Sequence, residues 1–288
     1  MGVRLGCSEM YVKRPLGIVL GLLAVAAAGP GARGAPDNGV VLKLSPYFRG
    51  LRTVRVESSA GPLRLLLDTG GGMTLVTPAV AARGGCNPVG RDVGHRMSGE
   101  RVTFERCEAW QVSSGAWHSR VDPIGVFDVN ALLPKELPAV DGLLALDAFR
   151  GRVLTLDWAA GDLTIHADAD ANRAARSALE LRAATGDNGR FLSVLVPVAS
   201  PRGRLWFLLD SGNIRGTLVS RHVVDAKLVT VGEHGEASLA IAGRPPHATS
   251  VIVDDLDIDG ALGTDFLLNS TVTLDLRLTT RSPRAPRR

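Results

Sequence analysis

Two short stretches of this sequence match each other. Residues 65–70 read Leu-Leu-Leu-Asp-Thr-Gly, and residues 207–212 read Phe-Leu-Leu-Asp-Ser-Gly. Each stretch places an aspartate after an apolar run of strand length and before a hydroxyl residue and a glycine. A buried strand that ends at an aspartate holds the carboxylate rigidly, and the glycine permits a sharp turn after it. The chain therefore carries two copies of one unit, in which a strand leads to a carboxylate and then a turn.

The repeat extends beyond these two motifs. Both copies continue with Thr-Leu-Val, at residues 74–76 and 217–219. Each then has a motif that begins with Asp-Gly, which reads Asp-Gly-Leu-Leu-Ala-Leu-Asp at 141–147 and Asp-Gly-Ala-Leu-Gly-Thr-Asp at 259–265. Thr-Leu-Asp follows in both copies. Because the order agrees, this is one duplicated unit and not the many short repeats of a solenoid.

The duplication divides the 288 residues into two lobes, and that length is ample for a buried core. We expect an N-terminal lobe over residues 39–166 and a C-terminal lobe over 187–280. Residues 167–186, which are rich in Ala, Asp, Arg and Ser, are expected to be a linker. The arginine-rich residues 281–288 are expected to be a disordered basic tail.

Within each lobe the pattern predicts mainly strands. Thr77 followed by Pro78 is typical of a helix start, so a short helix is expected over 79–83. Ser220 is expected to cap a matching helix over 221–226. The expected strands are 40–44, 51–56, 63–67, 153–157, 162–166, 192–198, 204–209 and 271–276. The sequence therefore predicts a duplicated all-β fold with short helices.

The N-terminus resembles a secretory signal. Lys13 and Arg14 precede an apolar stretch over 16–28, which ends in three alanines that offer an Ala-x-Ala cleavage site. This stretch is too short to cross a bilayer as a helix. We expect a signal peptide over residues 1–28, with cleavage as late as residue 38, and export to the periplasm or out of the cell. An uncleaved membrane anchor is the alternative.

Composition narrows the function classes. Hydrophobic residues are 45% and charged residues 22%, which is ordinary for a globular protein. The net charge of +4 equals the four arginines that follow Thr280, so we expect no basic surface for nucleic acid. Beyond the signal the cysteines are Cys86 and Cys107, which suggest one disulfide in an exported chain. Two free buried thiols are the alternative.

The two motif aspartates suit general acid–base hydrolysis. If the lobes pack about a pseudo-twofold axis, Asp68 and Asp210 meet, and two close carboxylates share one proton. One carboxylate then takes a proton from water while the other gives one to the scissile peptide group. Thr69 and Ser211 carry hydroxyls that can hydrogen-bond to the loop of the other lobe. This chemistry needs no metal and no cofactor, and we expect neither.

These motifs resemble those of the aspartic proteases of the pepsin and retroviral type. The reading Asp-Gly-Leu-Leu-x-Leu-Asp-x-Phe, followed by Thr-Leu-Asp, looks most like bacterial, retropepsin-like aspartyl proteases. The resemblance implies two six-stranded acid-protease barrel lobes, an endopeptidase that acts on peptide or protein, and a monomer whose lobes form one site. The residues that it implies are the catalytic Asp68 and Asp210, the bracing Thr69, Gly70, Ser211 and Gly212, and the hydrophobic-hydrophobic-Gly loops Leu143, Leu144, Ala145, Ala261, Leu262 and Gly263.

The sequence departs from the family pattern in four places. Ala145 stands where a glycine is expected, and Gly71-Gly72 and Asn213 follow the first and second motifs where Ala or Ser is more usual. The tyrosines are Tyr11 and Tyr47, so a hairpin within 93–104, which we expect to act as the flap, carries none. A catalytically weak or inactive peptide-binding protein of the cell envelope is the alternative function, and a structural envelope protein is a third.

Overall fold

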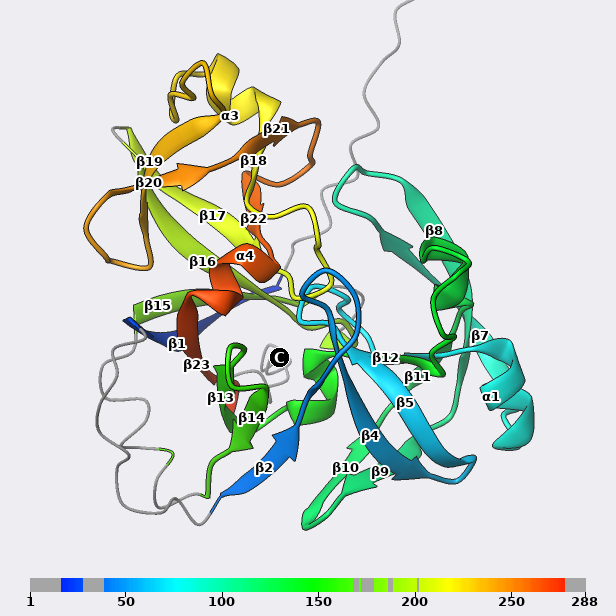
Figure 1. Ribbon diagram of the computed structural model, residues 1–288. Coiled ribbons are helices and arrows are strands. Elements are labelled where there is room, and N and C mark those ends of the chain that lie inside the picture. The colour runs from blue at the N-terminus through cyan, green and yellow to red at the C-terminus, as the bar shows by residue number, and fades with distance from the viewer. Residues whose placement is uncertain are drawn as a thin grey trace, which may run out of the picture.

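Strands from both halves of the chain build two curled sheets. The structure is a computed structural model, and it describes residues 17–27, 39–167, 171, 179–185, 189–200 and 202–277. In Figure 1 the strands β16 to β22 gather at the upper left and β4 to β12 at the right. The prediction of an all-β fold with short helices is confirmed.

The N-terminal lobe contains a ten-stranded sheet with the order β10-β9-β4-β5-β12-β6-β11-β8-β7, and β3 pairs with β4. Its strands are β3 (Ser45–Pro46), β4 (Arg52–Ser58), β5 (Gly61–Leu67), β6 (Leu75–Val76), β7 (Pro88–His95), β8 (Arg101–Cys107), β9 (Trp110–Ser114), β10 (Trp117–Val121), β11 (Ile124–Val126) and β12 (Gly142–Leu144). Its helices are α1 (Pro78–Arg83) and the short 3-10 helices η1 (Val129–Leu132) and η2 (Leu146–Phe149).

The second sheet has thirteen strands and contains segments from both halves of the chain, so it joins the lobes. Its main order is β2-β14-β13-β23-β1-β15-β16-β17-β22-β18-β21. The strands are β1 (Gly17–Ala27), β2 (Val40–Lys43), β13 (Val153–Asp157), β14 (Asp162–Ile165), β15 (Leu179–Thr185), β16 (Ser193–Ser200), β17 (Gly203–Leu209), β18 (Leu218–Ser220), β19 (Glu236–Ile241), β20 (His247–Ser250), β21 (Ile252–Asp254), β22 (Gly260–Leu262) and β23 (Ser270–Asp275). The helices α3 (Arg221–Asp225) and α4 (Thr264–Leu268) complete this part.

The duplicated motifs have the same local topology. In the N-terminal lobe β5 pairs in parallel with β12, which pairs antiparallel with β6. In the C-terminal lobe β17 pairs in parallel with β22, which pairs antiparallel with β18. Leu67 lies opposite Leu144, and Leu209 lies opposite Leu262. Each motif aspartate therefore follows a strand that is held from the side by the second motif of its own lobe.

The apolar runs before the aspartates are buried on both faces. Leu65 and Leu67 belong to the main hydrophobic core, whereas Leu66 between them packs into a second cluster. Phe207 and Leu209 also belong to the main core, and Leu208 faces a third cluster. Because both faces of these strands are buried, apolar residues occupy consecutive positions and do not alternate with polar ones.

The predicted linker over 167–186 is partly wrong. Its last seven described residues form β15, which pairs with β16 and β1. Leu181 and Ala183 are fully buried, and Arg182 between them is not, so the segment has the two-residue period of a half-buried strand. Because the segment is rich in alanine and arginine, its composition indicated a linker and did not indicate a strand.

Two terminal predictions fall largely outside the described residues. Gly17–Ala27, from the stretch expected to be the core of the signal peptide, forms β1 between β15 and β23. The remainder of residues 1–38 and the tail over 281–288 are not described, so the signal peptide and the tail stay predictions. Among the described residues, no helix combines the length and the apolar character that a membrane span requires.

Local predictions around the first helix are confirmed, and one in the second lobe is wrong. The Thr77 hydroxyl accepts a hydrogen bond from the Val80 N–H at the start of α1. Ser220 occupies the corresponding position of α3, but its hydroxyl donates to the Leu256 carbonyl and makes no cap. The same hydroxyl lies 2.5 Å from His222 Nδ1, so these two partners replace the N–H groups of α3. The predicted disulfide between Cys86 and Cys107 is present, with a Cα–Cα distance of 5.6 Å.

Candidate active site

Asp68 and Asp210 meet between the lobes, where β5 and β17 end. The two carboxyl groups are close enough for each to shift the pKa of the other. A β-carbon on Gly70 would lie 2.5 Å from Asp210 Cγ, and one on Gly212 would lie 2.8 Å from Asp68 Oδ2. These distances are too short for any side chain, so the glycine of each motif lets the carboxylate of the opposite lobe approach.

Thr69 and Ser211 connect the two loops reciprocally. The Thr69 N–H donates to Ser211 Oγ at 2.9 Å, and the Ser211 N–H donates to Thr69 Oγ1 at 3.0 Å. The hydroxyls donate in turn across the interface, Thr69 Oγ1 to the Leu209 carbonyl at 2.7 Å and Ser211 Oγ to the Leu67 carbonyl at 2.8 Å. Both residues are fully buried. Each hydroxyl thus links the end of the opposite strand to its own loop and fixes the separation of the carboxyl groups.

The hydrophobic-hydrophobic-Gly loops lie directly behind the aspartates. The Asp68 N–H donates to the Leu144 carbonyl at 3.0 Å, and the Asp210 N–H donates to the Leu262 carbonyl at 2.9 Å. All six predicted residues of these loops are buried, namely Leu143, Leu144, Ala145, Ala261, Leu262 and Gly263. The structure therefore brings all four motif sites together around one carboxyl pair.

The alanine in the first of these loops has a structural explanation. A β-carbon on Gly263 would lie 2.7 Å from the carbonyl oxygens of Asn213 and Gly216, so the second lobe requires glycine there. The active-site loop of the first lobe is one residue shorter. Ala145 fits there in an apolar cluster, and its N–H donates to Thr74 Oγ1 at 3.1 Å.

Two further aspartates, which were not predicted from the sequence as site residues, brace the active-site loops. Asp147 accepts hydrogen bonds from the Thr74 N–H and hydroxyl, and Asp265 accepts the same pair from Thr217. Burial raises the pKa of Asp147, and the hydrogen bonds from Thr74 oppose the rise. The recurring Thr-Leu-Val, placed at a fixed order before the second motif, is the sequence signal that could have identified both pairs.

The electrostatics of the carboxyl pair are dominated by burial. Burial raises the pKa of Asp68 above its usual value, and hydrogen bonds from the Gly70 and Gly71 N–H groups and with Asp210 oppose the rise. Burial also raises the pKa of Asp210 well above its usual value, and the negative charge of Asp68 raises it further. Asp210 is only 8% exposed. The pair therefore keeps one proton at pH values where isolated carboxyl groups are already ionised.

The β7–β8 hairpin reaches from the first lobe to the second. Its tip turns at Arg96, whose N–H donates to the Glu100 carbonyl at 2.9 Å. The Met97 carbonyl accepts a hydrogen bond from the Asp257 N–H at 3.0 Å, and the Met97 side chain packs against the apolar cluster that contains Leu208. The hairpin expected within 93–104 is thus part of a longer one that is in contact with both lobes.

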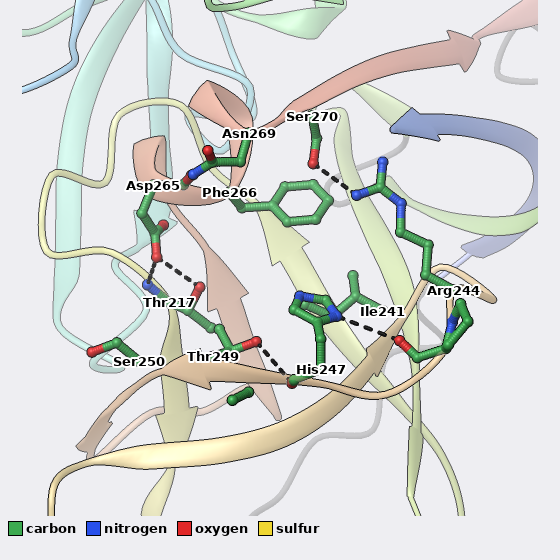
Figure 2. A pocket seen from close by; sticks show the side chains of 12 residues that line it. Thr217, Ile241, Arg244, His247, Thr249, Ser250, Asp265, Phe266, Asn269 and Ser270 are labelled. Atoms are coloured by element: carbon green, nitrogen blue, oxygen red, sulfur yellow. Dashed lines mark hydrogen bonds between the residues drawn. The ribbon is translucent and has the colours of Figure 1, made fainter. Parts of the chain in front are cut away.

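A separate open cavity of about 670 Å³ lies in the C-terminal lobe, and its lining comes mainly from β20 and α4 (Figure 2). It contains neither motif aspartate. Figure 2 shows Asp265 at its edge, but that carboxylate binds Thr217. Among the residues that the structure describes, no three His, Cys, Asp or Glu side chains converge as a metal site.

Comparison with known proteins supports the fold. No family model and no curated protein matches this sequence. Among solved structures, the chain is similar to the basic 7S globulin of soybean, with a TM-score of 0.50 and 10% identity. The match covers 86% of this chain and 98% of the globulin. At that identity the likeness extends to the fold alone, and it does not reach the narrower retropepsin-like resemblance. The chain has the pepsin-like, bilobal fold.

Proposed function

We propose that this protein is an exported aspartic-type endopeptidase in which Asp68 and Asp210 activate water. The observation that carries the proposal is the carboxyl pair itself. Two equivalent strands deliver two carboxyl groups to one point, and buried hydroxyls hold them there. Burying two acids is costly, and a purely structural protein gains nothing from it.

In the proposed reaction the pair carries one proton. Asp210 retains it because burial and the charge of Asp68 raise its pKa. The ionised Asp68 takes a proton from a water molecule that lies between the carboxyl groups, and the water oxygen attacks the peptide carbon. Asp210 gives its proton to the carbonyl oxygen, which forms a tetrahedral diol. Asp68 then gives the proton that it took from water to the amide nitrogen, the C–N bond breaks, and one diol hydroxyl returns its proton to Asp210, so that a carboxylic acid forms and the pair again holds one proton.

The substrate we propose is an extended peptide or unfolded protein, bound between the active-site loops and the β7–β8 hairpin. Such a substrate makes backbone hydrogen bonds of the kind that strands make. The disulfide between Cys86 and Cys107 agrees with an oxidising compartment, and the N-terminal pattern suggests the route there. We therefore place the protein in the periplasm or outside the cell, as a monomer. The residue pattern of the second motif in the first lobe, Asp-Gly-Leu-Leu-x-Leu-Asp-x-Phe, leads us to propose more narrowly a retropepsin-like enzyme.

A catalytically weak or inactive peptide-binding protein of the cell envelope is the second candidate. Two observations favour it. The described β7–β8 hairpin contains no tyrosine, and its tip is docked on the second lobe through Met97 and Asp257. The similar solved structure is named a globulin and not a protease.

The test compares wild type with Asp68→Asn and Asp210→Asn on unfolded casein, from about pH 3 to about pH 8. Asp162→Asn is the matched control, because that carboxylate pairs with Lys43 at the surface. Cleavage by wild type and the control, with loss in both dyad variants, supports the peptidase. A well-folded wild type that binds casein and cleaves it at no pH would instead support the second candidate.

A further inference from the structure

The chain returns across the active-site loop as it enters the second lobe. We call residues 189–192 the crossing segment. The Leu192 N–H donates to the Gly72 carbonyl at 2.6 Å. A β-carbon on Gly72 would meet the Phe191 ring at 3.4 Å. Gly72 belongs to the loop that begins at Asp68, so the crossing segment lies against the backbone that carries one of the two carboxyl groups.

Arg150 holds the crossing segment in place. Its Nη2 atom donates to the carbonyl oxygens of Gly189, Arg190 and Phe191 at 2.6, 2.9 and 3.1 Å. Hydrogen bonds from a charged donor are about twice as strong as neutral ones. The guanidinium also lies near Asp147, the carboxylate that binds Thr74 at the far end of the same loop. Arg150 thus acts on the second half of the active-site loop by two routes, at Gly72 and at Thr74.

The crossing segment also contacts the base of the hairpin. The Phe191 ring packs edge-on against Phe104 of β8, with 6.3 Å between ring centroids. Arg190 lies 3.6 Å from the buried Asp92 of β7. The segment therefore connects the active-site loop with the hairpin that reaches the other lobe.

The second lobe has no counterpart of Arg150. Three residues after Asp147 comes Arg150, whereas three residues after the equivalent Asp265 comes Leu268, which is 43% exposed. The duplication otherwise repeats the motif, the hydroxyl and the bracing aspartate. Arg150 is thus an asymmetric feature of a duplicated fold. A bound peptide has a direction, so it is a partner that such an asymmetric feature can serve.

We infer that Arg150 is a positioning residue for substrate. It holds the crossing segment beside Gly72, so that Phe191 can contact an apolar side chain of a peptide bound at the carboxyl pair. This inference rests on the proposed peptidase function. Because Arg150 touches none of the reacting atoms, it acts on binding more than on the chemical step.

The kinetic test uses Arg150→Met, Arg150→Lys and Phe191→Ala on unfolded casein, with Arg152→Met as an exposed control. Arg150→Met is expected to raise KM by about tenfold and to change kcat by less than about threefold. Lysine should restore KM, because an ammonium group presents three donors to three carbonyls. Phe191→Ala should match Arg150→Met, and the double variant should be no worse than either. A fall in kcat at constant KM, or fully additive effects, would overturn the inference.

A second readout is independent of turnover. In the Asp210→Asn background, amide exchange at Leu192 and the Kd for fluorescently labelled casein are measured with and without Arg150→Met. We expect exchange at Leu192 to rise at least about tenfold, with the amides of β5 unchanged, and Kd to rise in parallel. Unchanged exchange or unchanged affinity rejects the role of Arg150. If wild type cleaves nothing, the peptidase proposal fails while this result still decides the inference.

Discussion

Removing the Thr69 hydroxyl is the sharpest test of how the carboxyl pair is held. Thr69→Val keeps the shape of the side chain and deletes one oxygen. That oxygen donates to the Leu209 carbonyl at 2.7 Å and accepts from the Ser211 N–H at 3.0 Å. Both partner groups are buried, so the variant leaves one donor and one acceptor without a hydrogen bond.

Each buried backbone group left unpaired costs about 1–3 kcal/mol. With two such groups, Thr69→Val should lower the free energy of unfolding by about 2–6 kcal/mol. Domains commonly have about 5–15 kcal/mol in total, so the variant should still fold. With a urea slope of about 3 kcal/mol per molar, the midpoint should fall by roughly 0.7–2 M. Cleavage should fall as well, because the two carboxyl groups lose one link that fixes their separation.

Urea unfolding followed by tryptophan fluorescence suits this measurement, because Trp110 lies in the first lobe and Trp206 in the second. Thr249→Val is the matched control. Its hydroxyl donates to the His247 carbonyl at 3.4 Å on the surface, so its loss should change stability by less than about 0.5 kcal/mol. If Thr69→Val were no more destabilising than this control, and cleaved casein as well as wild type, the reciprocal hydroxyls would not be what joins the lobes.

Three further predictions concern single positions. Because the pKa of Asp210 is raised in the folded state, its carboxyl group supports folding at acid pH and loses that contribution as pH rises through the raised value. Asp210→Asn should thus increase Tm near pH 8, with no gain near pH 3. The gain in the free energy of unfolding should be about 1.4 kcal/mol per unit of pKa difference between the folded and unfolded states. An equal gain at both pH values in thermal scans would contradict this. Gly263→Ala should destabilise by about 1–3 kcal/mol, because its β-carbon meets two carbonyls, whereas Ala145→Gly should cost about 1 kcal/mol or less; equal urea midpoints would refute the asymmetry. Reducing the Cys86–Cys107 disulfide, whose cysteines are 21 residues apart, should cost about 3 kcal/mol in urea, and an unchanged midpoint would argue against it.

The features that could be predicted from the sequence are short local motifs that occur twice in the chain. An apolar run, an aspartate, a hydroxyl and a glycine define one strand end, and the second copy 142 residues later supplies its partner. Twofold packing then makes the meeting of Asp68 and Asp210, and the crossing bonds of Thr69 and Ser211, the simplest outcome. The structure places all four in this arrangement.

The features that the sequence did not predict depend on pairings between distant, unrelated segments. β15 lies in a stretch whose composition resembles a linker, and it lies between the next strand, β16, and the distant β1, where Gly21 pairs with Leu181. The bonds from Arg150 to the crossing segment span about forty residues, and the contact of Met97 with Asp257 joins the lobes. None of these belongs to the repeat, so no second copy existed to reveal it.

The repeated and the unrepeated parts of the chain would together allow two similar carboxyl groups to perform different tasks. The repeat supplies symmetry, and a fully symmetric pair would have no preferred acid and no preferred direction for a peptide. The parts outside the repeat remove that symmetry. The hairpin rises from the first lobe, and Arg150 holds the crossing segment beside the Asp68 loop alone. In the proposed chemistry, the duplicated residues supply the reaction and the unduplicated ones orient the substrate. Variants of the first kind should therefore act on kcat, and variants of the second kind on KM.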